Sequence, residues 1–293
     1  MTSTDVPLAP LPTLEERHLT PRVFESAEFG KLEAFVPTHS DYHCQDPVAP
    51  ALVLIPGLGM DAIGFLRQLS LAPYAHIHLF QTPNNPVTSE PGMMGFGRYV
   101  EEYILSHKLD QHPGGVVLGG CSMGGAISLA VALRGRVKLR GLVLIGTFGS
   151  CQHLAKWKRV CAPLAWLIPM RAGRRVFWYV VSRSKLFGNI QPAEADWLIS
   201  CKLPRTQRYF AAAVKALTTQ EQIAAARSLN IPTLVLHGTD DRVLPYVAGQ
   251  ELAQNIPGAQ LVTLEDAGHA LFFTHHQRTN AAIAAFLKTL AAV

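Results

Sequence analysis

Cysteine is scarce in this chain, and its cysteines are not spaced like metal ligands. There are five among 293 residues: Cys44, Cys121, Cys151, Cys161 and Cys201. An odd number without a short Cys-x-x-Cys spacing argues against both a disulfide framework and a zinc ribbon, so we expect reduced thiols. His76 and His78 share one face of an expected strand but lack a third ligand, which predicts structural roles. We therefore expect no metal site.

Long apolar runs are also missing. Residues 1–14 are rich in proline and threonine and contain Asp5, without the basic start and apolar stretch of a signal peptide. The most apolar later stretch, 162–181, is interrupted by two prolines, one glycine and three arginines, so it cannot cross a bilayer as a continuous helix. No segment repeats at a fixed period. We expect a flexible N-terminal arm over residues 1–20, no membrane span and a cytoplasmic location.

What the chain does have is a series of compact apolar segments. Six have the length of buried strands: 51–55, 76–80, 115–119, 139–145, 233–237 and 260–264. Helical patterns separate most of them, which predicts an α/β fold with a mainly parallel sheet covered by helices on both faces. Residues 23–25 and 33–36 are expected to form antiparallel leading strands. Residues 91–97, which include Met93 and Met94, are expected to form a loop, either at a pocket entrance or flexible on the surface.

The interval 145–233 is too long for a single crossover connection. Its helical, aromatic and basic character predicts a helical lid over 149–225, inserted between core segments 21–148 and 226–293. All four tryptophans fall there: Trp157, Trp166, Trp178 and Trp197. Between positions 149 and 215, twelve Lys or Arg residues accompany two acidic ones, so the local charge is +10 against +5 for the whole chain.

The most informative motif is Gly120-Cys121-Ser122-Met123-Gly124, between an expected strand (116–118) and an expected helix (126–133). A Gly-x-Ser-x-Gly sequence at a strand-to-helix turn is typical of a nucleophile elbow, which exposes the serine hydroxyl near a helix N-terminus. Taken alone, it also fits a glycine-rich connection that happens to contain a serine. Cys121 occupies the variable position and is expected to pack inward.

Two later loops supply the partners that such a serine needs. The strand at 233–237 leads into Gly238-Thr239-Asp240-Asp241, and the strand at 260–264 leads into a loop that ends at His269. In open α/β sheets, sites form at the carboxyl ends of strands. The chain order serine, acid, histidine differs from the orders of the two main serine-protease folds.

With these motifs, the chain resembles the α/β-hydrolases from about Val23 to its C-terminus. Within them it is similar to carboxylesterases of this size with a helical lid, including the pimeloyl-carrier-protein methyl ester esterases. The resemblance implies that Ser122 is the nucleophile, His269 the general base and acid, and Asp241 the carboxylate that orients the imidazole. The family's acid stands three residues after the strand-ending glycine and four before a proline. That spacing favours Asp241 over Asp240, which we expect to be a solvated turn residue.

The resemblance also implies an oxyanion hole made of backbone N–H groups. Met123, directly after the nucleophile, supplies one donor. Residues 56–60, Pro-Gly-Leu-Gly-Met, resemble the family's His-Gly-x-Gly loop and assign the second donor to Leu58. Pro56 replaces the usual histidine, which removes a bracing side chain and leaves the backbone donor in place.

The implied activity is hydrolysis of a carboxylic ester through an acyl-enzyme, without a cofactor. Serine at the elbow argues against haloalkane dehalogenases and epoxide hydrolases, which carry aspartate there. Thioesterases, carbon–carbon hydrolases, perhydrolases and acyltransferases share the triad and stay open. So does an alternative of another class, a non-catalytic ligand receptor on the same fold. Acyl length, leaving group and oligomeric state stay open as well.

The expected lid adds an interpretation of substrate and partner. Trp157, Trp166 and Trp178 are candidates for the wall of an acyl pocket. The segment also contains a basic patch of Arg171, Arg174 and Arg175. These arginines face solvent, or they attract an acidic acyl carrier protein or an ester that carries a carboxylate. The alternative is a lid whose tryptophans pack on the main domain and whose charges are simply solvated. We expect a small-molecule ester as the substrate and no nucleic-acid partner.

Overall fold

The computed structural model describes residues 19–83, 90–154, 156 and 206–291. The expected lid tryptophans and arginines lie outside the described residues, as does most of the expected N-terminal arm. Within the described ranges, no helix combines the length and apolar character that crossing a membrane requires.

A single eight-stranded sheet runs through the centre of the described structure, in the order β1-β2-β4-β3-β5-β6-β7-β8. Its strands are β1 (Leu19–Ser26), β2 (Gly30–Pro37), β3 (Ala51–Ile55), β4 (His76–Gln81), β5 (Val116–Cys121), β6 (Leu139–Ile145), β7 (Thr233–Gly238) and β8 (Gln260–Leu264). β1 and β2 form an antiparallel hairpin, β2 is antiparallel to β4, and the other pairs are parallel. The predicted mainly parallel sheet with antiparallel leading strands is confirmed.

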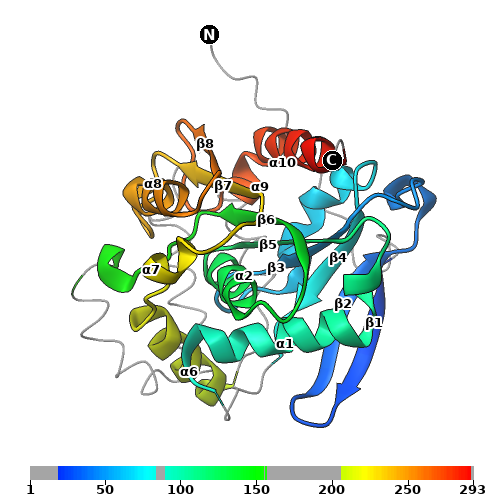
Figure 1. The fold of residues 1–293 in the computed structure, drawn as a ribbon, viewed down its shortest axis with the longest axis horizontal. Coiled ribbons are helices and arrows are strands. Elements are labelled where there is room, and N and C mark those ends of the chain that lie inside the picture. Colours follow the sequence, from blue (N-terminus) through cyan, green and yellow to red (C-terminus); the bar gives the residue numbers. More distant parts are fainter. Residues whose placement is uncertain (1–18, 84–89, 155, 157–205, 292–293) are drawn as a thin grey trace.

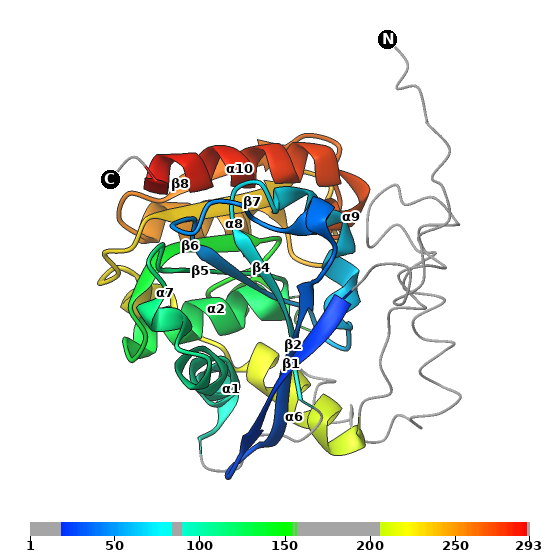
Figure 2. The same ribbon diagram turned by 90° about the vertical axis from the view of Figure 1, so that its right-hand side faces the viewer.

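Helices cover the sheet on both faces (Figure 2). The described α-helices are α1 (Gly92–Ser106), α2 (Met123–Arg134), α6 (Gln207–Thr218), α7 (Ile223–Ala226), α8 (Tyr246–Asn255), α9 (Leu271–Thr274) and α10 (His276–Ala291). Short 3-10 segments are η2 (Ser40–Tyr42), η3 (Ala62–Leu71), η4 (Leu109–Gln111) and η5 (Cys151–His153). Side chains of α1, α2, α6, α7 and α8 join one core cluster, whereas η3, α9 and α10 contribute to the other.

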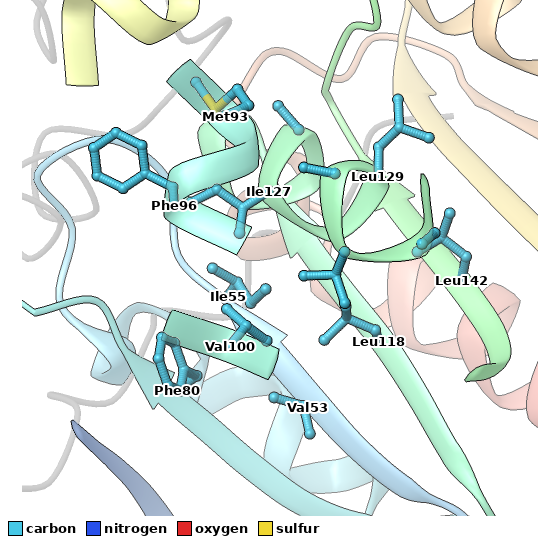
Figure 3. Packing of buried hydrophobic residues seen from close by; sticks show 14 of the residues in the cluster. Val53, Ile55, Phe80, Met93, Phe96, Val100, Leu118, Ile127, Leu129 and Leu142 are labelled. Atoms are coloured by element: carbon cyan, nitrogen blue, oxygen red, sulfur yellow. The ribbon is translucent and has the colours of Figure 1, made fainter. Parts of the chain in front are cut away.

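The two core clusters arise from the alternation of side chains along each buried strand. Val53 and Ile55 of β3 point to the cluster under α1 and α2, whereas Leu52 and Leu54 belong to the opposite cluster. Figure 3 shows the first cluster, where Val53 and Ile55 lie among side chains of the neighbouring strands and of α1 and α2. Because both faces are buried, the strands read as continuous apolar runs, which is why the sequence located them.

Two segments differ from, or add to, the sequence expectations. The expected loop at 91–97 is wrong: α1 begins at Gly92, and Met93 is buried in the core beside Phe96. Part of the expected lid interval lies on the core, where Tyr209 of α6 packs edge-to-face on Phe96 with ring centroids 5.8 Å apart. Burial of this aromatic pair holds α6 against α1.

Candidate active site

Three loops at the carboxyl ends of β5, β7 and β8 carry the predicted triad. Ser122 directly follows β5 and precedes α2, Asp241 stands three residues after the end of β7, and His269 lies five residues after the end of β8. β5, β6, β7 and β8 are parallel neighbours, so their carboxyl ends share one edge of the sheet. The topology therefore places at one edge of the sheet three residues that are 28 to more than 100 positions apart in the sequence.

Ser122 sits in a strained backbone conformation, with φ 53° and ψ −119°. For a residue other than glycine, such a conformation costs about 1–3 kcal/mol and persists only where the surroundings enforce it. Here the Ser122 N–H donates to the Ile145 carbonyl oxygen at 2.9 Å, and the buried Thr147 hydroxyl donates to the Ser122 carbonyl oxygen at 2.6 Å. β6 and the residues that follow it therefore hold the turn.

The glycines of the motif are required by close backbone approach. A Cβ added at Gly124 would lie 2.0 Å from the Ile55 carbonyl oxygen, and one at Gly120 would lie 2.4 Å from the Gly124 carbonyl carbon. Both contacts are to backbone, so no side-chain rotation can relieve them. This packing sets α2 directly against the end of β3 and the loop that follows it.

We expect Gly124→Ala to destabilise the fold by about 3 kcal/mol or more, since it forces backbone apart in a close-packed core. Gly97→Ala is the matched control, because a Cβ there meets Val131 and Arg134 at ordinary distances of 3.4–3.5 Å. In helix α1, that change should leave stability unchanged or raise it by about 0.5–1 kcal/mol. Thermal and urea unfolding of the two variants measures the difference. A Gly124→Ala protein as stable as the parent would show that this contact is not rigid.

Asp241 and His269 are in direct contact: Nδ1 of His269 lies 2.7 Å from Oδ2 of Asp241. The other carboxylate oxygen, Oδ1, accepts hydrogen bonds from the N–H groups of Val243 and Leu244, both at 2.9 Å. Burial by itself would raise the pKa of Asp241, but the charge of His269 and hydrogen bonds from His237 and His269 outweigh burial and hold that pKa well below its usual range. Asp241 therefore stays ionised. Because it accepts the hydrogen on Nδ1 of His269, Nε2 is the ring nitrogen that can take up a proton.

Asp240 has a different environment from its neighbour. Its N–H donates to the Ala267 carbonyl oxygen at 2.9 Å, whereas its side chain is exposed. The structure thus places Asp241, rather than Asp240, against the imidazole.

The predicted oxyanion loop follows β3 and lies beside the elbow. A Cβ built on Gly57 would be 3.4 Å from the Ser122 Cβ, and Gly59 has a positive φ of 70°. Leu58 packs against the core cluster that contains Met123. Met123 is the first residue of α2, where N–H groups have no partner within the helix and favour negative charge. The loop after β3 and the N-terminus of α2 therefore both lie beside Ser122.

The other residues considered in the sequence analysis, Cys121, His76 and His78, make packing or hydrogen-bond contacts within the fold. Cys121 is 2% exposed and belongs to the core cluster under α10. His76 Nε2 is 3.0 Å from the Asp46 carbonyl oxygen, and His78 Nδ1 is 3.0 Å from the Tyr103 hydroxyl. Burial, aided by the nearby charge of Arg22, lowers the pKa of His78 to about 3. In the described part of the chain, no group of three His, Cys, Asp or Glu side chains is arranged to hold a metal ion.

Two residues at the site were not singled out by sequence reasoning. Thr147 follows β6 by two positions and braces Ser122, and His237 lies in β7 with Nε2 3.4 Å from Oδ2 of Asp241. The signal for His237 was a histidine at the end of an otherwise apolar strand, four residues before the acid. Thr147 had no signal of its own in the sequence.

Comparison with known proteins decides the family. The model of the alpha/beta hydrolase family matches residues 52–282. The chain belongs to this family. The match spans the oxyanion loop, the elbow, the acid loop and the histidine loop, and with the esterase relatives below it makes the chain a hydrolase.

Relatives of this hydrolase include two with different named substrates. 2-Hydroxymuconate semialdehyde hydrolase of Pseudomonas putida is 31% identical over 211 residues, which are 64% of this chain and 72% of that protein. Pimeloyl-[acyl-carrier protein] methyl ester esterase of Nitrosomonas europaea is 26% identical over 215 residues, 70% of this chain and 82% of its own. Among solved structures, a thermophilic esterase from Thermogutta terrifontis aligns with a TM-score of 0.75 at 21% identity, covering 92% of this chain and 99% of the esterase. The structural likeness shows the alpha/beta hydrolase fold.

Proposed function

We propose that this hydrolase is a serine carboxylesterase in which Ser122, His269 and Asp241 form the triad. The observation that carries the proposal is the 2.7 Å contact between His269 Nδ1 and a buried, ionised Asp241, at the sheet edge where Ser122 occupies its strained turn. A buried carboxylate on one imidazole nitrogen fixes the tautomer that a general base needs.

The proposed reaction has two acyl-transfer steps. His269 takes the hydroxyl proton of Ser122 while Oγ attacks the ester carbonyl carbon, and the N–H groups of Leu58 and Met123 donate to the tetrahedral oxyanion. The intermediate expels the alcohol, which receives the proton from His269, and an acyl ester remains on Ser122. Water then loses a proton to His269 and attacks the acyl group, which releases the acid and restores the serine.

Substrate class is the next question. The names of two relatives, pimeloyl-[acyl-carrier protein] methyl ester esterases of Nitrosomonas europaea and Aromatoleum aromaticum, support an ester linked to an acidic carrier or carrying a carboxylate. The positive charge of the segment 149–215 fits the same class. The second candidate is hydrolysis of a 2-hydroxymuconate semialdehyde-like compound, because the relative of that name has the higher identity, 31%.

A fluorophosphonate probe tests the serine mechanism directly. We expect it to label the protein on Ser122, with protection by a competing ester and no labelling of Ser122→Ala. A panel of p-nitrophenyl esters of graded length, run beside the matching thioesters and 2-hydroxymuconate semialdehyde, then separates the candidate substrates. A protein that stays unlabelled and turns over none of them would be a ligand receptor.

The basic segment makes a further prediction about substrate choice. Reversing charge in Arg174→Glu/Arg175→Glu should lower kcat/KM for acyl-carrier or carboxylate-bearing esters by about tenfold at low salt, since steering depends on unscreened charge. A small neutral ester should be affected little. The matched control is Lys108→Glu/Lys138→Glu, which reverses two exposed charges on the described surface. Equal kinetics for anionic and neutral esters in the lid variant, without salt dependence in the parent, would exclude a role for this charge.

A further inference from the structure

His237 is a fully buried histidine beside the triad carboxylate. Its Nε2 lies 3.0 Å from the Leu244 carbonyl oxygen and 3.4 Å from Oδ2 of Asp241. Both neighbours are acceptors, so Nε2 must carry a hydrogen.

Among the described residues, none offers an acceptor to the other ring nitrogen of His237. In the described part of the chain, Nδ1 is buried without a hydrogen-bond partner, and a Cβ built on Gly249 of α8 would stand 2.5 Å from it. A second proton on Nδ1 would be a buried donor without an acceptor, which is unfavourable. The geometry therefore favours a neutral imidazole that donates from Nε2.

With this donor, four N–H groups surround the carboxylate of Asp241. Two backbone N–H groups, of Val243 and Leu244, occupy Oδ1. Oδ2 faces Nδ1 of His269 at 2.7 Å and Nε2 of His237 at 3.4 Å. The carboxylate thus lies between two imidazoles, one able to gain a proton and one held neutral.

We infer that His237 is a positioning residue for the triad: its buried Nε2–H fixes the orientation of Asp241 toward His269 and competes for the negative charge on Oδ2. The inference rests on the proposed esterase function. Removing His237 should strengthen the hydrogen bond that His269 Nδ1 donates to Asp241, because a carboxylate that loses one donor becomes a stronger acceptor for the remaining one.

The titratable groups that act on Asp241 come from β7 and from the loop after β8. They are His269 after β8 and His237 in β7. The phenol ring of Tyr246 in α8 packs edge-on against His237, with centroids 6.1 Å apart, and the backbone of Gly146 after β6 approaches Oδ2 of Asp241. A shift in the pH profile therefore reports on the contacts that His237 and His269 make with Asp241.

The test compares three variants of the full chain: His237→Phe, which keeps a ring without an N–H, His237→Gln, which restores a donor, and His78→Phe. His78 is the control because it is also a buried histidine on a strand, 4% exposed and hydrogen-bonded to Tyr103. For each, kcat and KM on a p-nitrophenyl ester are measured across pH, with thermal unfolding as the measure of stability.

We expect His237→Phe to lower kcat about tenfold or more with little change in KM, because slight misplacement of a reacting group is costly. The acidic limb of kcat/KM should move to higher pH, because Asp241 then interacts with the imidazole of His269 alone. His237→Gln should recover most of kcat and return the limb to its parent position. His78→Phe should lower Tm without moving the limb. A His237→Phe enzyme with parental kcat and pH profile, or a His237→Gln enzyme no better than His237→Phe, would overturn the inference.

A readout that needs no substrate separates this inference from the proposed function. The proton between His269 Nδ1 and Asp241 gives a far-downfield ¹H resonance, whose position reports the strength of that hydrogen bond. It should move in His237→Phe and stay in place in His78→Phe, whether or not the protein hydrolyses esters. If His237→Phe does not fold, Gly249→Ala displaces the ring while keeping its N–H, and an unmoved resonance in that variant would count against the inference.

Discussion

Ser122→Ala is expected to remove almost all turnover, lowering kcat by about 10⁵- to 10⁶-fold, as is typical when the nucleophile of a triad is lost. Without the hydroxyl, no acyl-enzyme forms, and the residual rate comes from substrate binding and the oxyanion donors. His269→Ala should have an effect of similar size, because nucleophile and base act as a unit. Initial rates with a p-nitrophenyl ester and active-site titration measure both variants.

The control for Ser122→Ala is the neighbouring thiol. Cys121 is buried and packs in the core, so Cys121→Ala should keep kcat within a few-fold of the parent. Thermal unfolding should show that Ser122→Ala remains folded, since its backbone contacts to Ile145 and Thr147 do not involve the removed oxygen. If Ser122→Ala kept substantial activity while Cys121→Ala lost it, the nucleophile would be the thiol.

Asp241→Asn is expected to lower kcat by about 10⁴-fold, the scale seen when the acid of a triad loses its charge and its ability to fix the tautomer. An amide facing His269 Nδ1 can present an N–H instead of an acceptor, which turns the proton-accepting nitrogen away from Ser122. KM should change much less, because the carboxylate is buried behind the imidazole.

The adjacent aspartate provides the matched comparison. Asp240→Asn changes the same functional group at an exposed position and should leave kcat within about twofold. Rates for the two variants, measured with the same ester and at the same pH, decide the assignment. The reverse result, with Asp240→Asn inactive and Asp241→Asn active, would mean that the acid loop adopts another register when substrate binds.

The centre of the sheet was predictable because β3 to β7 are buried on both faces. β3, β6 and β8 have the bounds that the apolar runs predicted. β4 and β7 end one residue later than predicted, and β5 begins one residue later and ends two residues later. The start of α1 was not predictable in the same way. Gly92, Gly95 and Gly97 disfavour helix, yet burial of Met93 and Phe96 in the core outweighs the cost of these glycines.

Some features of the candidate site were likewise predictable from the sequence, and others were not. Its chain order and the preference for Asp241 follow from short motifs attached to strand ends, which are local features. The hydrogen bond from Thr147 to the Ser122 carbonyl oxygen joins the ends of two strands. The contact of His237 with Asp241 depends on how the chain bends after β7. No local pattern encodes the direction in which those side chains point.

The sequence by itself determined the fold class, the order of the strands along the chain and the residues at which chemistry is expected, because apolar periodicity and turn motifs act over a few residues. Only the tertiary structure decided which face of the sheet each helix covers. It alone placed neutral, buried His237 against the carboxylate of Asp241. These outcomes depend on how strands pair and on the side-chain directions that close packing then permits, and both are fixed only when distant segments meet.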